Sequence, residues 1–413
     1  MAGPDTTRAA LRALMSPEAV RARCTELLDI AFTDGLPHFE IDPTRLGPCA
    51  ETVAQEIRTN YPTLDVPFHS RWRHFEFGGR DLWAESPAAR GLKGDARTSA
   101  EGDLAVVSVL LDAGAGPDWS YTDEATSIRA VRSEGLALAS LRLFESGLFS
   151  ADPADPLRVD GSALEALTAD ALSAGMQAGS GNPLVGVEGR AALLRRLGAE
   201  LGRHADVFGR NDSLRPGNLL LALRDRASGG TLPAREILVA LLDTLTGMWP
   251  SGFVTDGVAM GDVGRHPALR RDDATDGLVP FHKLSQWLSY SLIEPLQRAD
   301  VKVTALDGLT GLAEYRNGGL FVDTGVLKLR DPSLAAKSHP PQDALIVEWR
   351  ALTVALLDRM AVDVRRILGR SADELPLASV LQGGTWSAGR RVAAAARPGG
   401  PPPIAVASDG TLF

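Results

Sequence analysis

The sequence predicts a mainly α-helical protein. Apolar residues recur at three- and four-residue spacing over long stretches, two-residue alternation is rare, and no internal repeat is present. We expect a single helical domain over residues 1–396 with a small irregular or β element. The run RPGGPPP (397–403) predicts an extended connection to a short tail, so residues 397–413 are expected to lie outside that domain.

Six stretches carry the helical pattern. They are residues 16–31, 160–176, 188–205, 234–249, 281–297 and 344–369. The first begins with Ser16 as an expected N-cap and Pro17 at the first helical position. In the second, Ser162 and Glu165 have the spacing of a capping box. In the fifth, Pro295 is expected to end or kink the helix.

Three short stretches are the best strand candidates. They are HFEF (74–77), GGLFVD (318–323) and PIAVAS (403–408). We expect these to form the small β element.

Composition excludes several functional classes. A net charge of −9 and a pI near 5.4 argue against a nucleic-acid partner, which selects a basic face, and give no support for an anionic membrane surface. The longest apolar runs are far shorter than the roughly 20 residues of a spanning helix. Cys24 and Cys49 do not indicate a disulfide framework, and the N-terminus does not read as a secretory signal. We therefore expect a cytoplasmic protein with reduced cysteines.

The sequence contains no motif for a metal or an organic cofactor. It lacks a phosphate loop, a dinucleotide fingerprint and an H-E-x-x-H pair. His69 and His74 are close in sequence, but their spacing suits no known zinc pattern. We expect no metal and no cofactor.

The segment 67–83 mixes basic and aromatic side chains. His69, Arg71, Arg73 and His74 alternate with Phe68, Trp72 and Phe75. Guanidinium groups and aromatic faces together suit a phosphate and a planar group. The alternative is a surface hairpin whose arginines pair with nearby acids.

Two further segments combine apolar and charged residues. In 281–296, Lys283, Gln286 and Tyr290 form a polar stripe beside an apolar one, and a solvated helix face would explain the stripe equally well. In 309–327, Glu314 lies among apolar residues; an isolated buried carboxylate is costly, so it either belongs to a site or pairs with Arg316.

A helix over 346–358 contains the remaining charged pair of interest. Glu348 and Arg350 interrupt a strongly apolar stretch. We interpret them as belonging to a structural ion pair.

Four segments resemble the uracil-catabolism protein 4 family of fungi and bacteria. They are YPTLDVPFHSRWRHFEFGG, PFHKLSQWLSYSLIEPL, LTGLAEYRNGGLFVDTGVL and LIVEWRALTVALLD, and the similarity covers nearly the whole chain. The resemblance implies a place in a pyrimidine-degrading route that handles uracil as its ribonucleotide, opens the ring and releases urea. It leaves the chemical step of this component unassigned.

Five segments are similar, in the same order, to the queuosine-nucleotide N-glycosylase/hydrolase family. They are NPLVGVEGRAALLRRLG, MWPSGFVTDG, PFHKLSQWL, LTGLAEYR and VEWRALTVALL. That resemblance implies a helical fold similar to helix-hairpin-helix DNA glycosylases and hydrolysis of a bond between ribose 5-phosphate and a base. It matches the lysine-bearing helix at Lys283 and the catalytic aspartate at Glu314, where glutamate is a departure from the family.

Together these resemblances lead us to expect an N-glycosidase of N-ribosylurea, as the 5-phosphate, that yields ribose 5-phosphate and urea. Glu314 would meet the positive charge that develops on the sugar and orient or deprotonate water, and Lys283 would protonate the ureido group, although His69 and His74 are alternatives. The substrate is expected to contact His69, Arg71, Trp72, Arg73, His74, Trp249, Asp256, Trp287, Tyr315 and Arg316. The expected partner is this small phosphorylated ribosyl substrate; the oligomeric state is open.

Two other functions stay open at this stage. An amidohydrolase acting on an acyclic ureido intermediate would leave the ribose bond intact. A non-catalytic nucleotide-binding or scaffold protein of the same pathway would show no turnover. A DNA glycosylase is disfavoured by the acidic charge.

Overall fold

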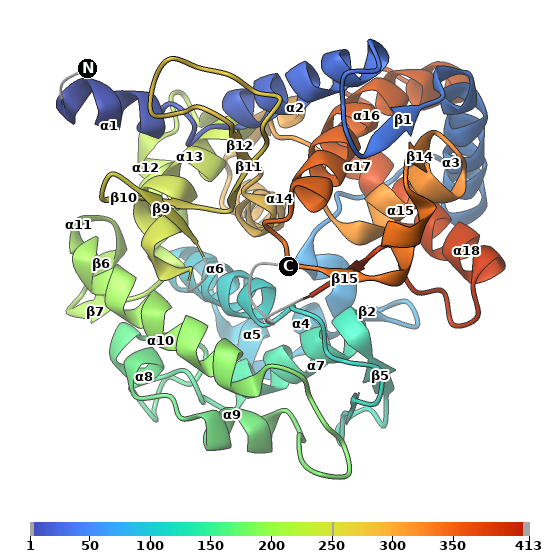
Figure 1. Cartoon of the computed structure of the whole chain (residues 1–413). Helices are drawn as coiled ribbons and strands as arrows, with labels where there is room; N and C mark the ends of the chain where they lie inside the picture. Colours follow the sequence, from blue (N-terminus) through green and yellow to red (C-terminus); the bar gives the residue numbers. More distant parts are fainter. Residues whose placement is uncertain (1–3, 250–251, 408–413) are drawn as a thin grey trace. The chain divides into compact units, whose positions relative to one another are not determined.

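The computed structural model describes residues 4–249 and 252–407 (Figure 1). Its chain is mainly helical with short two-stranded sheets, so the predicted class is confirmed. The likeness to helix-hairpin-helix glycosylases stays a prediction. None of the described helices combines the length and the apolar character that crossing a bilayer requires.

The described chain divides into two compact units. Unit 1 comprises residues 4–69, 253–286 and 305–407, and unit 2 comprises residues 70–249, 252 and 287–304. The chain therefore passes between the units repeatedly, and one crossing falls inside helix α14, after Gln286. The division into 1–396 and 397–413 stays a prediction.

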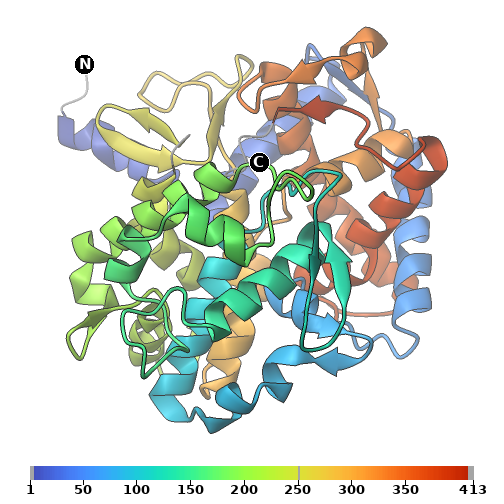
Figure 2. The same cartoon turned by 90° about the horizontal axis from the view of Figure 1, so that it is seen from below.

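Unit 1 holds the longest helix and most of the C-terminal half. Its elements are α1 (Pro4–Arg12), α2 (Pro17–Phe32), β1 (Phe39–Ile41), η1 (Pro43–Arg45), α3 (Leu46–Asn60), β9 (Phe253–Thr255), β10 (Val258–Gly261), β11 (Val263–Arg265), β12 (Leu278–Pro280), the first turn of α14 (Lys283–Arg298), η4 (Leu306–Gly308), α15 (Tyr315–Asp323), β14 (Leu327–Leu329), η5 (Pro332–Ala336), β15 (Ser338–His339), α16 (Ala344–Leu368), α17 (Leu377–Val380), the π-helical η6 (Leu381–Thr385), α18 (Trp386–Ala396) and β16 (Ala405–Val406). The pairs β1–β14, β9–β10 and β11–β12 are antiparallel, and β15–β16 is parallel. Helix α16 packs against α2, α3 and α15, and α3 lies beside α18 at one edge of the unit (Figure 2).

Unit 2 is built from shorter helices and hairpins. Its elements are η2 (Arg71–Phe75), β2 (Glu76–Phe77), β3 (Arg80–Asp81), α4 (Leu82–Glu85), α5 (Pro87–Gly91), α6 (Gly94–Leu110), β4 (Ser120–Thr122), β5 (Arg129–Val131), α7 (Arg132–Glu145), α8 (Gly161–Glu165), α9 (Ala169–Gly175), α10 (Val187–Arg203), α11 (Ala205–Phe208), β6 (Gly209–Arg210), β7 (Ser213–Leu214), α12 (Asn218–Arg226), β8 (Thr231–Pro233), α13 (Ala234–Leu245), η3 (Thr246–Met248), the rest of α14 and β13 (Lys302–Thr304). Its packing centres on α10 with α8 and on α6 with α7 and α12.

Most predicted helices are confirmed, and the start signals explain where they begin. The Ser16 hydroxyl accepts the Ala19 N–H at 3.2 Å with Pro17 at the first helical position. A helix end is explained in the same way: Gly369, directly after α16, takes the left-handed conformation that is common at helix C-termini. Helix α14 runs past Pro295 to Arg298, so this proline does not end the helix, and the kink that was expected as the alternative stays a prediction.

Two other predictions of local structure are wrong. The stretch 160–176 forms two short helices, α8 and α9, and Thr168 rather than Ser162 provides a side-chain cap, for α9. GGLFVD (318–323) is the second half of helix α15 and not a strand. Of HFEF only Glu76 and Phe77 form a strand. Of the described part of PIAVAS, residues 403–407, only Ala405 and Val406 do, and Ser408 lies outside the described residues.

Candidate active site

Glu314 caps the N-terminus of α15 with its own side chain. One carboxylate oxygen, Oε2, accepts the Arg316 N–H at 2.8 Å, and the other, Oε1, accepts the Asn317 N–H at 2.6 Å. N-caps are usually Ser, Thr, Asp or Asn, whose shorter side chains reach these donors more directly. A glutamate in this position is therefore more than capping requires.

The loop before Glu314 is held by buried amides. The Asn317 amide donates to the Leu312 carbonyl at 3.2 Å and accepts the Thr385 hydroxyl at 2.8 Å. Two residues earlier than Leu312, the Thr310 hydroxyl accepts the Gln286 amide at 2.7 Å. These bonds fix the backbone on both sides of the carboxylate.

Two glycines place α15 close to its neighbours. A Cβ atom on Gly318 would lie 2.7 Å from Trp349 Nε1 and 2.8 Å from the Thr353 hydroxyl, both on α16. On the α18 side, a Cβ on Gly389 would lie 2.4 Å from the Arg316 carbonyl oxygen. Small residues at these contacts therefore decide how near the capped end of α15 lies to both helices.

Lys283 is the first residue of α14, the helix to which Gln286 also belongs. Its side chain keeps partial exposure among buried neighbours, as does that of Glu314. Both residues belong to unit 1, and the positive charge of Lys283 favours the ionised form of the Glu314 carboxyl. The catalytic roles expected for Lys283 and Glu314 stay predictions.

Burial nevertheless dominates the electrostatics of Glu314 and raises the pKa of its carboxyl. The two backbone N–H bonds and the charges of Lys283 and Arg316 favour the ionised form but do not outweigh the loss of hydration. A carboxyl with a raised pKa is a stronger base than an exposed one once it is ionised.

The alternative role expected for Glu314 was an ion pair with the Arg316 side chain, but the two residues interact in another way. Glu314 binds the backbone N–H of Arg316, whereas the guanidinium donates to the Gly400 carbonyl at 2.8 Å and lies over the Tyr315 ring. Tyr315 itself is 41% exposed. Gly400 belongs to the segment that begins at residue 397. This segment therefore contacts α15 at Arg316, which follows Glu314 by two residues.

Two other predicted residues of unit 1 lie elsewhere in that unit. His69 Nδ1 is 2.9 Å from Gln382 Oε1 in the π-helical turn, and its ring is 6.5 Å from that of Trp386. Asp256 is exposed in the β9–β10 turn with a φ of 48°. The contact of Asp256 with the substrate, expected through a ribose hydroxyl, stays a prediction.

The other predicted residues belong to unit 2. The Arg71 guanidinium is fully buried, donates to the Ser108 hydroxyl at 2.6 Å, and lies 3.1 Å from Asp112. Its NH1 lies 3.0 Å from His74 Nδ1, and the guanidinium lies over the Trp287 ring. A phosphate contact by Arg71 stays a prediction, and it would require the protein groups that now surround this guanidinium to give way.

Arg73 and two tryptophans complete this group. Arg73 pairs with Glu76 and Glu294, both at 2.6 Å, as the surface-pairing alternative expected. Trp72 donates to the Ser291 carbonyl at 2.7 Å, and Trp249 is buried directly after η3. Of the predicted residues in unit 2, the contacts described above bring Arg71, His74 and Trp287 together.

The solvated-face alternative for the stripe on α14 is wrong, because Gln286 and Tyr290 are fully buried. Of the two α16 charges interpreted as belonging to a structural ion pair, Arg350 is confirmed, with Asp262 of unit 1 as its partner, whereas Glu348 contacts His266, whose charge depends on its protonation. Glu348 Oε2 lies 3.1 Å from His266 Nε2, and Arg350 binds Asp262 through two bonds of 2.9 and 2.7 Å.

Sequence reasoning missed Asp262 and Asn317, and it noted Gln286 only as part of a stripe. Asp262 lies between two strands in MGDVG, a weak signal that resembles any polar turn. Asn317 follows Glu314 by three residues, which is the position that receives a cap bond. Across residues 4–249 and 252–407, no three His, Cys, Asp or Glu side chains gather as metal ligands would.

Comparison with known proteins places the chain in a family. Residues 13–413 match the model of the family described as "Protein of unknown function (DUF1688)". Protein urg3 of Schizosaccharomyces pombe is 40% identical over 410 residues, which cover 97% of this chain and 98% of that protein. Uracil catabolism protein 4 of Lachancea kluyveri is 37% identical over 409 residues, which cover 91% of this chain and 92% of that protein. The chain therefore belongs to the DUF1688 family together with these relatives, and the resemblance to uracil catabolism protein 4 found in the sequence is confirmed.

Proposed function

We propose that this protein acts in uracil catabolism as a hydrolase that cleaves the N-glycosidic bond of N-ribosylurea 5-phosphate. The pathway is supported by the name of the Lachancea kluyveri relative. The step is supported by one observation above all: a part-buried glutamate, whose pKa burial raises, is fixed by two backbone N–H groups at the start of α15.

The chemistry requires a base, an acid and an anion near the sugar. As the C1–N bond breaks, positive charge builds on the ribose, and a preorganised carboxylate lowers the barrier. Glu314 in its ionised form supplies that charge and takes a proton from the attacking water. The carboxylate keeps lone pairs for this role, because each oxygen accepts one backbone N–H.

Lys283 is the proposed donor to the leaving group. The ureido nitrogen leaves as neutral urea only if it gains a proton while the bond to C1 breaks. In each turnover Glu314 gains one proton and Lys283 loses one, so both groups return to their starting state by exchange with solvent. The products are ribose 5-phosphate and urea, and no side chain of the protein is consumed.

The phosphate is assigned to arginines. Three arginines are expected to contact the substrate: Arg71, Arg73 and Arg316. Of these, Arg316 belongs to the same unit as Glu314 and follows it by two residues. A guanidinium binds a phosphate through paired donors, and the NH1 of Arg316 now donates to Gly400. We propose that Arg316 contributes to this contact.

A turnover assay tests the proposal. The purified full chain is incubated with N-ribosylurea 5-phosphate, and urea and ribose 5-phosphate are measured together. Equal release of both, abolished in Glu314→Gln, is the expected result. Glu314→Ser is the matched control for capping, because serine caps a helix well but offers no carboxylate.

Three outcomes would contradict the proposal. Full activity in Glu314→Ser would reduce Glu314 to a helix cap. Urea without ribose 5-phosphate would indicate an amidohydrolase. Saturable binding of the nucleotide without products would indicate a binding protein.

A further inference from the structure

Asp262 clamps the backbone from which Lys283 projects. The Asp262 carbonyl accepts the N–H groups of Phe281 at 2.9 Å and His282 at 3.1 Å. Its carboxylate oxygen Oδ2 then accepts the Lys283 N–H at 3.0 Å. Three successive N–H groups at the start of α14 therefore converge on one residue, which fixes the direction in which the helix begins.

Arg350 fixes that aspartate in turn. Its guanidinium binds both Asp262 oxygens, and it lies 4.0 Å over the Phe281 ring. Burial opposes the ionisation of Asp262, but the charge and hydrogen bonds of Arg350 outweigh it, so the pKa of this carboxyl is lowered. A bidentate pair of this kind restricts orientation as well as distance.

His282 takes a backbone conformation that residues other than glycine rarely adopt. Its φ is 48°, in the left-handed region. The imidazole is buried, and its Nε2 lies 3.2 Å from the Leu14 carbonyl. Strained residues of this kind persist where the surroundings hold them, and they cluster at functional sites.

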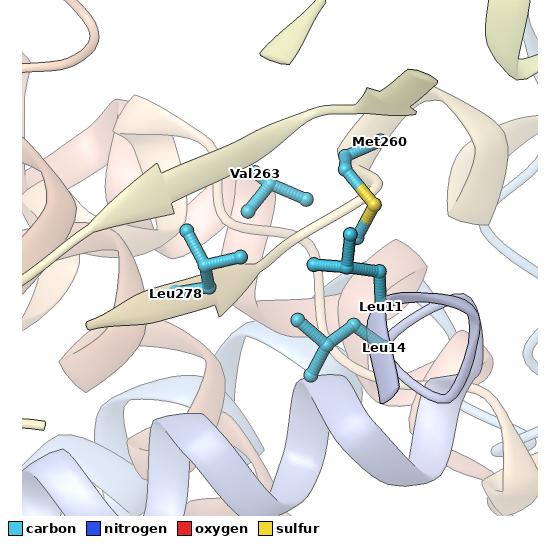
Figure 3. Packing of buried hydrophobic residues seen from close by; sticks show 5 residues of the cluster. All are labelled: Leu11, Leu14, Met260, Val263 and Leu278. Atoms are coloured by element: carbon cyan, nitrogen blue, oxygen red, sulfur yellow. The ribbon is translucent and has the colours of Figure 1, made fainter. Parts of the chain in front are cut away.

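The surroundings that hold His282 are visible in unit 1. Leu11 and Leu14, from the end of α1 and the turn after it, pack with Met260, Val263 and Leu278 of the β10–β12 segment (Figure 3). This apolar cluster presents the Leu14 carbonyl to His282. The N-terminal segment thereby supports the residue that precedes Lys283.

We propose that Asp262, Arg350 and His282 are positioning residues that set where the Lys283 ammonium lies relative to Glu314. The inference rests on the proposed function for its catalytic meaning, but the placement of Lys283 can be tested separately. A lysine has a long flexible stem and a charge that the N-terminus of a helix does not favour, so a fixed helix start is needed to hold its orientation.

The test compares two variants of the full chain. His282→Gly keeps the left-handed backbone but removes the imidazole, and His282→Asn keeps a side chain that tolerates this region and can donate. Asn211→Gly is the matched control, since Asn211 has a φ of 49° and is exposed in the β6–β7 turn.

The readout is the rate at which an amine-reactive reagent modifies Lys283, measured by mass spectrometry at one pH. The chain has five lysines, and exposed Lys337 serves as the internal reference. In His282→Gly the ratio of Lys283 to Lys337 labelling should rise by roughly threefold or more, because a loosened segment populates open states more often. The ratio should return toward the wild-type value in His282→Asn.

Turnover gives an independent readout. A misplaced acid should lower kcat by about 10- to 100-fold with little change in KM. Absence of turnover in the wild type would reject the proposed function, while the labelling ratio would still report on the positioning of Lys283.

A lowered melting temperature with an unchanged labelling ratio would overturn the inference, because it would show a structural role alone. If His282→Gly does not fold, Arg350→Lys is measured in the same way. It keeps a cation against Asp262 but loses the bidentate contact, so the same rise in the ratio is expected.

Discussion

Gly318 and Gly319 are neighbours inside α15, yet they predict different losses of stability on replacement by alanine. A Cβ on Gly318 would meet Trp349 and Thr353 at 2.7–2.8 Å, whereas a Cβ on Gly319 would meet only Pro403, with Cδ the nearest atom at 3.1 Å. Real Cβ atoms essentially never come as close as the first set. The pair therefore isolates the packing of α15 against α16.

The expected magnitudes follow from this geometry. Replacing a glycine inside a helix by alanine gains about 1 kcal/mol from backbone entropy at either position. Overpacking at Gly318 costs about 1–3 kcal/mol, because the indole of Trp349 is fully buried and cannot move aside. Since the helix gain is common to both variants, Gly318→Ala should be less stable than Gly319→Ala by about 1–3 kcal/mol.

Urea unfolding followed by circular dichroism measures this difference. The two variants are compared as transition midpoints with unchanged slopes, so that only stability differs. Gly318→Ala should also reduce turnover more than Gly319→Ala, because it displaces the helix that Glu314 caps. Equal midpoints for the two variants would refute the close-packing argument.

Three further results are expected. Because burial raises the pKa of Glu314, ionising it costs folding free energy above its unfolded pKa of about 4.3, so the stability of Glu314→Gln relative to the wild type should rise between pH 4 and pH 8 in urea titrations; a difference independent of pH would contradict the raised pKa. Lys283→Met removes both the proposed proton donor and a charge that favours ionised Glu314, so turnover should be strongly reduced and the acid limb of the residual pH–rate profile should move to higher pH; a limb that stays in place would argue against Glu314 as the base. Gly389→Ala would bring a Cβ to 2.4 Å from the Arg316 carbonyl, a backbone atom that cannot rotate away, and should lose stability at the upper end of about 1–3 kcal/mol in thermal melts; an unchanged melting temperature would show that α18 can move away from α15.

Glu314 and Lys283 can both be singled out from the amino-acid sequence. Glu314 stands out because a carboxylate among apolar residues must be compensated, and Lys283 stands out by resemblance. The helices are predictable because an apolar stripe at helical spacing survives in any tertiary context, and Ser16 with Pro17 is a local start signal. These inferences depend only on neighbours in the chain.

The residues that support this pair depend on contacts between distant segments. Asp262 and Arg350 are 88 positions apart, and Asn317 and Thr385 are 68 apart, so no local pattern announces either pair. GGLFVD has a composition that suits a strand, but the cap at Glu314 and the close approach to Trp349 make it a helix.

By itself, the sequence determined the helical class and the family, and it predicted the two residues on which the proposed function depends. Each of these is recorded in local spacing or in the identity of single side chains. Only the tertiary structure decided that Gln286 and Tyr290 on α14 are buried, that Arg71 is enclosed by its own partners, and that the Asp262 carboxylate accepts the Lys283 N–H. Burial and pairing arise from segments that fold together across the chain, and their energies exist only once those segments meet.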